Sequence, residues 1–266
     1  MWHNQIPDWV TRKGDGSLVS DNTLYRNIFD HISSVAGRYS GKIKGWDVVN
    51  EAILDDGSYR ENDFYKISAD EYIFKSFEIA HKIDPNAELY YNDFSMYKPE
   101  KCDAAIRIAN KILERGLRID GIGLQAHWGL DYPSIDEIET SILKIHEAGF
   151  RVHFTELDID VLPNLWEIEG ADLSDNFKSN DQLNPYKSSL PDSISDLLSD
   201  RYSEIFELFD KHNDKIDRVT FWGLSDGHSW KNDWPAKGRT NYPLLFDREN
   251  NPKKAYKDIM MLFNEK

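Results

Sequence analysis

The chain has 266 residues, 40% of them hydrophobic, and a formal net charge of -15. This length can bury a sizeable core and suits one large α/β domain or two small ones. The charge argues against nucleic acid or an anionic membrane as a partner, because phosphate binding needs clustered Lys and Arg. A neutral substrate suits it better. The 8 Trp, 13 Tyr and 13 Phe could stack on sugar faces, although most aromatic residues belong to the core.

The single cysteine, Cys102, leaves no disulfide framework and no thiolate metal site. No apolar stretch approaches the roughly 20 residues of a transmembrane helix, and the N-terminus has no basic-then-apolar signal region. Residues 1–5 are aromatic and polar, like the end of a strand that has no body before it. We therefore expect the chain to begin inside a domain.

Apolar periodicity predicts helices and strands that alternate along the chain. Capping-box spacing at residues 68–71 and 134–137 marks two helix starts. An irregular segment over 161–191, rich in Pro, Gly, Ser and Asn, is typical of a functional loop. The predicted helices cover residues 22–39, 68–83, 101–115, 134–148, 194–209 and a segment from about 252. The predicted strands cover 43–50, 87–92, 119–126, 151–157 and 218–222.

Alternation of short apolar strands with helices indicates parallel strands that are covered by helices. A (β/α)8 barrel fits best, because reactive residue types collect at the C-terminal ends of several strands. The alternative is a doubly wound sheet, but no strand is followed by a Gly-rich phosphate loop.

Two glutamates, Glu51 and Glu156, stand at the ends of predicted buried strands that are two βα units apart. In a closed barrel both would point into the same mouth. Glycosidic cleavage needs such a pair, since one carboxyl protonates the leaving oxygen and the other attacks or activates water. The alternative is that each is a solvated loop residue. Neither lies in a run of charges, which favours the functional interpretation.

Further polar residues follow the same strands. His127 leaves the strand that carries Gln125, and Asp158 lies two residues after Glu156 on the same face. An imidazole between two carboxylates could orient a nucleophile and keep it ionised. A lone histidine can also be ordinary satisfied structure. The sequence lacks histidine pairs with zinc-ligand spacing and lacks the Gly-x-Ser-x-Gly elbow of serine hydrolases, so we expect no metal site and no serine nucleophile.

In order, spacing and strand-end placement, five runs across essentially the whole chain resemble glycoside hydrolase family 10. Any one of them alone would be weak, but the combination is highly specific. The runs are Trp2-His3-Asn4-Gln5, Trp46-Asp47-Val48-Val49-Asn50-Glu51, Gly123-Leu124-Gln125-Ala126-His127, Thr155-Glu156-Leu157-Asp158 and Phe221-Trp222-Gly223-Leu224-Ser225-Asp226.

The resemblance implies a (β/α)8 endo-β-1,4-xylanase that retains anomeric configuration, acts on xylan or xylo-oligosaccharides and needs no cofactor. It implies that Glu51 is the general acid/base and Glu156 the nucleophile, with carboxyls about 5 to 5.5 Å apart. The resemblance further implies that Asn50 holds the sugar 2-hydroxyl and that His127 and Asp158 are an orienting pair. Gln125 and Asn92 would be supporting polar contacts. Trp222 and Trp230 would wall the sugar site, and Trp2 and His3 would lie near its floor.

The chain departs from the family at its beginning. The first two βα units, most of the third strand and a sugar-gripping Glu-Asn-Lys cluster have no counterpart before Trp2. We therefore expect residues 1–266 to be an incomplete catalytic barrel that a separate N-terminal segment completes, since an exposed sheet edge would aggregate. Two alternatives stay open: a truncated barrel that binds xylan without turnover, and a related barrel β-glucanase. Because polymeric xylan cannot enter a cell, we expect an extracellular, cell-surface or periplasmic location.

Overall fold

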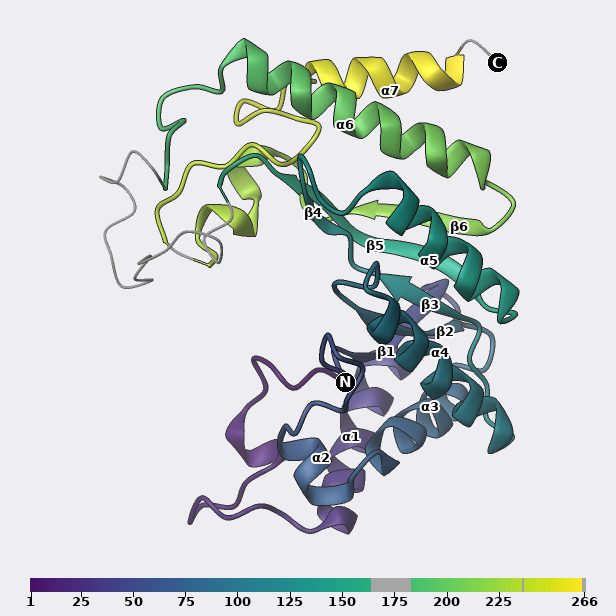
Figure 1. The fold of residues 1–266 in the computed structure, drawn as a ribbon. Coiled ribbons are helices and arrows are strands. Elements are labelled where there is room, and N and C mark those ends of the chain that lie inside the picture. Colours follow the sequence, from purple (N-terminus) through teal and green to yellow (C-terminus); the bar gives the residue numbers. More distant parts are fainter. Residues whose placement is uncertain (164–182, 236, 265–266) are drawn as a thin grey trace. The chain divides into compact units, whose positions relative to one another are not determined.

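A computed structural model describes residues 1–163, 183–235 and 237–264 (Figure 1). The chain forms two compact units. Unit 1 comprises residues 1–125 and 140–154, and unit 2 comprises residues 126–139 and 155–266. The chain passes from one unit to the other three times, and the last crossing lies within strand β5.

Unit 1 is built on a parallel sheet in the order β1-β2-β3-β5. The register pairs Asn50 with Asn92, and Asn92 with Gly123. Because the strands run in the same direction, their carboxyl ends lie along one edge of the sheet. The strands are β1 (Gly45–Asn50), β2 (Glu88–Asp93), β3 (Gly121–Leu124) and β5 (Arg151–Asp160), of which residues 151–154 belong to this unit.

The longer helices of unit 1 bury an apolar face. In α1 the buried residues Leu24, Ile28 and Ile32 recur at helical spacing, and α1 packs against α3. The Ser20 side chain caps α1 by accepting a hydrogen bond from the Thr23 amide. The helices are a 3-10 turn η1 (Asp8–Val10), α1 (Asp21–Tyr39), α2 (Asp63–Ser68), α3 (Glu71–Ile83), α4 (Pro99–Glu114) and α5 (Ile135–Glu147), whose first residues belong to unit 2.

One of the two predicted capping boxes forms. Ser134 and Glu137 exchange hydrogen bonds, with the Ser134 amide donating to Glu137 Oε2 at 2.8 Å and the Glu137 amide donating to Ser134 Oγ at 3.3 Å. The box expected at 68–71 was wrong. Ser68 ends the short helix α2, which apolar periodicity missed because it has only six residues, and α3 starts at Glu71 without a side-chain cap.

The strand predicted over 119–126 is shorter than expected. Strand β3 ends at Leu124, Ala126 adopts a positive φ of 63°, and a separate strand β4 (His127–Gly129) follows. Regular extended geometry therefore stops between Gln125 and His127. The break places Gln125 in unit 1 and His127 in unit 2.

In unit 2, β4 pairs in parallel with the second half of β5, and β6 also pairs with β5. Helices α6 and α7 pack side by side (Figure 1). The remaining elements are α6 (Asp192–Lys211), β6 (Ile216–Phe221), the 3-10 turns η3 (Asp226–His228) and η4 (Trp230–Asn232), and α7 (Lys254–Asn264). Of the irregular segment predicted over 161–191, residues 164–182 lie outside the described residues.

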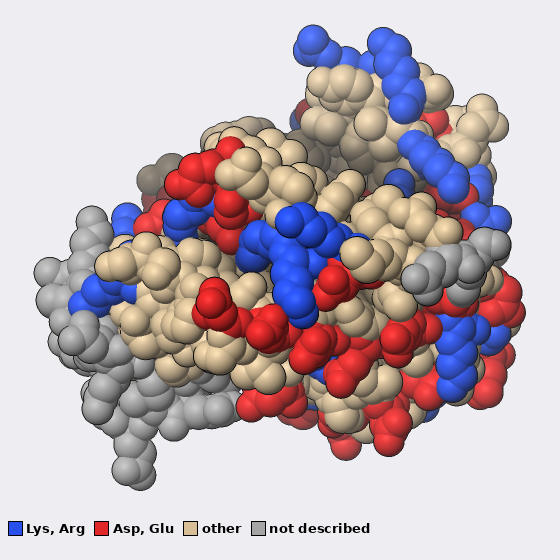
Figure 2. All heavy atoms as spheres, turned by 90° about the horizontal axis from the view of Figure 1, so that it is seen from above, with Lys and Arg blue, Asp and Glu red and all other residues tan. Residues whose placement is uncertain are grey.

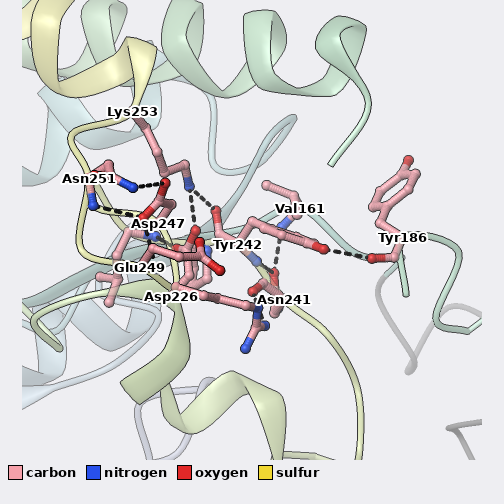
Figure 3. A network of polar contacts seen from close by, with 12 residues as sticks. Val161, Tyr186, Asp226, Asn241, Tyr242, Asp247, Glu249, Asn251 and Lys253 are labelled. Carbon is pink, nitrogen blue, oxygen red and sulfur yellow. Dashed lines mark hydrogen bonds and ion pairs between the residues drawn. The ribbon is translucent and has the colours of Figure 1, made fainter. Parts of the chain in front are cut away.

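A buried ion pair organises the long segment after β6 (Figure 3). The Lys253 ammonium donates to Asp226 Oδ2 at 3.0 Å and to the Tyr242 carbonyl at 2.7 Å. Asp226 Oδ1 accepts from the Leu244 amide at 2.9 Å, and the Asp226 carbonyl accepts from Asn232 Nδ2 at 2.8 Å. Buried Asp226 thus connects the start of α7 to the turn that carries Trp230.

The surface reflects the composition. Figure 2 shows Asp and Glu side chains over much of the face that it draws, in keeping with the net charge of -15. Within the described ranges, no helix combines the length and the apolar character that crossing a bilayer requires.

We predict that Gly121→Ala destabilises unit 1 by about 1 to 3 kcal/mol, because overpacking a core forces side chains and backbone to move. Gly121 faces the ring of Tyr90 on β2, and an added Cβ would lie 2.6 Å from Tyr90 Cε1 and 2.5 Å from the Arg151 carbonyl oxygen. Urea denaturation of the purified chain measures the change.

Gly14→Ala is the matched control for this substitution. A Cβ at Gly14 meets no atom within 4 Å, so its free energy of unfolding should stay within about 0.5 kcal/mol of the parent. Equal stability of the two variants would contradict the packing described at Gly121.

Candidate active site

The first candidate cluster gathers at the carboxyl edge of the unit 1 sheet. Gln125 Nε2 donates to Glu51 Oε1 at 3.1 Å and to Asn50 Oδ1 at 3.0 Å. Asn92 Nδ2 donates to the same Asn50 oxygen at 3.0 Å, and Asn50 Nδ2 lies 3.4 Å from Glu51 Oε1. Four residues that the sequence predicted at strand ends are therefore in contact.

The register of the sheet explains this cluster. Asn50 and Asn92 are paired residues on β1 and β2, while Gln125 directly follows β3. Asn92 and Gln125 are buried, at 1% and 3% exposure, so their amides need partners within the protein. Glu51 consequently sits among neutral amide groups that fix its carboxyl, and no cation is hydrogen-bonded to it among the described contacts.

The backbone at Glu51 is strained. Glu51 has a φ of +58°, a left-handed conformation that costs a residue with a Cβ about 1 to 3 kcal/mol. Such a conformation persists only where surrounding contacts hold it. The Glu51 amide donates to the Asn92 carbonyl at 3.0 Å, which ties the turn to β2.

The opening residues Trp2 and His3 also lie in unit 1. Trp2 forms an isolated parallel bridge with Asn50, and its ring meets the His3 ring edge-on with centroids 6.4 Å apart. Burial, together with the positive charge of Arg60, lowers the pKa of His3, while the charge of Glu51 opposes this shift. Trp2 Nε1 and His3 Nδ1 are buried and have no hydrogen-bond partner among the described residues.

The second cluster lies in unit 2. His127 Nδ1 is 2.9 Å from Asp158 Oδ1, and His127 Nε2 is 3.3 Å from Glu156 Oε2. The imidazole thus bridges the two carboxylates, as the sequence predicted. The pairing of β4 with β5 causes this, because His127 is opposite Asp158, and Glu156 lies two residues before Asp158 on the same strand face.

The charges of this cluster favour a protonated imidazole. Burial alone would lower the pKa of His127, but the charge and hydrogen bond of Asp158, with the bond to Glu156, raise it to about 9. Burial would raise the pKa of Asp158, yet the charges of Lys231 and His127 hold it below its usual range. The cluster therefore presents Glu156 with a cationic partner.

Trp230 and Lys231 complete the unit 2 cluster. Trp230 Nε1 donates to Asp158 Oδ2 at 2.8 Å, and its ring centroid lies 4.9 Å from that of His127. Lys231 Nζ is buried 3.5 Å from Asp158 Oδ1 and 3.7 Å from Asp160 Oδ2. Sequence reasoning missed Lys231, and its only signal was its position next to Trp230.

Among the described residues of unit 2, the exposed tryptophans are Trp222 and Trp234. Trp222 directly follows β6 and is 47% exposed, and its amide donates to the Leu157 carbonyl at 3.1 Å. Trp234 stacks on Trp230 with ring centroids 6.3 Å apart. Both present apolar faces, as sugar stacking requires.

Residues 1–262 match the family described as glycosyl hydrolase family 10. An endo-1,4-β-xylanase A of Xylanibacter ruminicola is 44% identical over 99% of this chain and 71% of its own length. An endo-1,4-β-xylanase of Geobacillus stearothermophilus is 38% identical over 96% of this chain and 73% of its own. The chain belongs to glycosyl hydrolase family 10. The solved structure of a family 10 endoxylanase from a sugarcane soil metagenome is 43% identical and has a TM-score of 0.90. The match covers 98% of this chain and 74% of the chain in that structure.

Membership of family 10 confirms the resemblance seen in the sequence and the predicted (β/α)8 fold class. It also confirms that the chain is a glycoside hydrolase. The roles of individual residues stay predictions, as does the separation of the two carboxyls, since Glu51 belongs to unit 1 and Glu156 to unit 2.

We predict that protonation of His127 stabilises unit 2. Its pKa is about 9 in the folded chain against 6.5 for an unperturbed histidine, so the contribution is complete below pH 6.5 and disappears as the pH rises through 9. The difference corresponds to about 3 kcal/mol. Urea denaturation at pH 6 and pH 9.5 measures it, with His127→Gln as the reference that cancels other titrations. A parallel loss of stability in both proteins would count against a cationic His127.

Proposed function

We propose that the protein is an endo-β-1,4-xylanase that hydrolyses internal bonds of xylan with retention of anomeric configuration. The observation that carries this proposal is family 10 membership over residues 1–262, with relatives up to 44% identical that are named endo-1,4-β-xylanases. The acidic surface is compatible with a neutral polysaccharide. Because polymeric xylan cannot enter cells, the proposal includes an extracellular, cell-surface or periplasmic location.

Glu156 is proposed as the nucleophile. Its carboxylate attacks the anomeric carbon and forms a covalent glycosyl-enzyme as the bond to the leaving oxygen breaks. The support for this role is the contact with His127, whose positive charge is favoured by the charge and hydrogen bond of Asp158. The imidazole of His127 lies 3.3 Å from the carboxylate that makes the attack and fixes its orientation.

Glu51 is proposed as the general acid/base. It gives a proton to the leaving oxygen in the first step and removes a proton from the attacking water in the second. This group has to change its protonation state twice per turnover. Its hydrogen bonds with Gln125 and Asn50 support the assignment, because they hold the carboxyl in a fixed direction.

The remaining predicted residues are proposed to bind the sugar. Asn50 is proposed to hold the 2-hydroxyl, in a position that Asn92 and Gln125 fix through its amide oxygen. Trp222 and Trp230 are proposed as stacking walls, with Trp2 and His3 near the floor. The buried nitrogens without partners on Trp2 and His3 are suited to donate to or accept from sugar hydroxyls.

We predict that the chain releases reducing ends from xylan with a higher kcat/KM than from cellulose. We also predict that Glu156→Gln lowers kcat on xylan at least about 10⁴-fold, because the step that forms the covalent intermediate is lost. Reducing-sugar assays on both polymers measure this. The exposed Glu147 offers a matched control, and Glu147→Gln should keep full activity. If Glu156→Gln turns over xylan about as fast as Glu147→Gln, Glu156 is not the nucleophile. A higher kcat/KM on cellulose than on xylan would exclude xylan as the preferred substrate.

We predict that Glu51→Gln lowers kcat on xylan about 10²- to 10⁴-fold, the usual contribution of general acid/base catalysis. An aryl xylobioside with a dinitrophenolate leaving group needs no proton, so its first step should continue and produce a burst of phenolate. Azide should then restore steady-state turnover, because it attacks the intermediate without a base. Stopped-flow absorbance follows both phases. A variant without a burst and without a response to azide would argue against the acid/base role.

A further inference from the structure

The peptide group that follows Glu51 is held from several sides. Arg60 Nε donates to the Glu51 carbonyl at 3.1 Å, and the Ala52 amide donates to the hydroxyl of Tyr91 at 3.1 Å. This second bond is unusual, because a side chain on β2 accepts the buried backbone N–H of the residue that directly follows Glu51, whose φ is positive. Tyr91 therefore contacts the segment whose conformation sets the direction of the Glu51 side chain.

The Tyr91 hydroxyl has its own fixed orientation. Tyr91 is fully buried on β2, and its hydroxyl donates to Asp93 Oδ2 at 2.6 Å while it accepts from Ala52. Alternation along β2 places Tyr91 and Asp93 on one face of the strand, and Asn92 on the other face among the amides around Glu51. Strand β2 thus supports Glu51 from both of its faces.

Asp93 is anchored in turn. Its Oδ1 accepts from the Phe94 amide at 2.9 Å and from Lys101 Nζ at 3.0 Å. The fully buried Lys101 also contacts Asp55 Oδ1 at 3.1 Å and lies 3.5 Å from the centroid of the Phe94 ring. The ammonium therefore has two carboxylates and an aromatic face around it, which leaves little freedom for Asp93.

Asp93 reaches the cluster around Glu51 by a second route. Its carbonyl accepts from the Gln125 amide at 3.0 Å, and the Gln125 side chain donates to Glu51 Oε1. Asp93 thus fixes the peptide after Glu51 through Tyr91, and its own carbonyl anchors the backbone of Gln125. A buried ion pair that served stability alone would not need a hydroxyl directed at Ala52.

We propose that Tyr91, Asp93 and Lys101 form a positioning chain for Glu51, which holds its strained backbone and so directs its carboxyl. The inference rests on the proposed acid/base role of Glu51. Loss of the chain should impair proton transfer more than substrate binding, since none of its three members touches the proposed sugar-binding residues through a side chain in the described contacts. It should not remove the nucleophile.

Tyr91→Phe tests the proposal, because it keeps the ring and removes the hydroxyl. The expected result is a kcat on xylan about 10- to 100-fold lower, as for a catalytic group displaced by about 1 Å, with KM within about twofold. With the dinitrophenyl xylobioside the phenolate burst should persist, and azide should restore steady-state turnover. A role in stability alone would lower the unfolding temperature without this dependence on leaving group and azide.

Tyr90→Phe is the matched control. Tyr90 precedes Tyr91 on β2, is equally buried, and its hydroxyl donates to Glu88 Oε2 at 3.1 Å near the other end of the strand. It should keep kcat and show no response to azide. Equal kinetics in the two variants, measured below their unfolding temperatures, would overturn the proposal. So would a loss in Tyr91→Phe that is the same for both substrates and insensitive to azide.

Two further variants keep the test decisive. If Tyr91→Phe does not fold, Asp93→Asn replaces it, because the amide can still accept from Tyr91 but no longer pairs with Lys101; a parental kcat in this variant overturns the proposal. Glu51→Gln separates the two levels of inference. Full activity of Glu51→Gln would reject the acid/base assignment itself. If Glu51→Gln instead loses activity that azide restores, while Tyr91→Phe has parental kinetics, only the positioning chain is rejected.

Discussion

Both candidate clusters depend on the need of buried polar groups for partners, at strand ends in unit 1 and within β4 and β5 in unit 2. An unpaired buried group costs about 1 to 3 kcal/mol, so the side chains that leave the sheet must bond to one another. Asn92 and Gln125 meet this need through Asn50 and Glu51. Asp158 meets it through hydrogen bonds with His127 and Trp230 and an ion pair with Lys231. The same bonds that satisfy the burial requirement also fix the orientation of each glutamate.

The two clusters differ in charge, and the difference fits the chemistry proposed for each. The Glu51 carboxyl is hydrogen-bonded to the neutral side-chain amides of Gln125 and Asn50. Glu156 contacts His127, whose pKa of about 9 keeps a positive charge beside it through the neutral range. Two residues of the same type can therefore serve as acid and as nucleophile because their surroundings, not their own chemistry, separate them.

Sequence reasoning located residues whose signal is local. Glu51, Gln125 and Glu156 were predicted because each is a polar residue that follows or ends an apolar run, and within unit 1 the parallel strands bring Glu51 and Gln125 into contact. The members of the positioning chain carry no such signal. In the sequence, Tyr91 looks like one more aromatic residue in a buried strand, and Lys101 looks like part of the first turn of a helix. Only the three-dimensional structure reveals that the Lys101 ammonium reaches Asp93. Helix α2 was missed for a different reason, because its six residues are too few to show an apolar period.

The positive φ of Glu51 explains why these supports are needed. Glycine would adopt this conformation without strain, but it has no carboxyl, so a glutamate that must stand at this turn has to be held in an unfavourable backbone region. Bonds to Asn92, Arg60 and Tyr91 converge on the two peptide groups that flank it. The strain, the hydroxyl directed at Ala52 and the fully buried Lys101 therefore belong to one arrangement, in which the stability of the fold is used to fix the direction of one side chain.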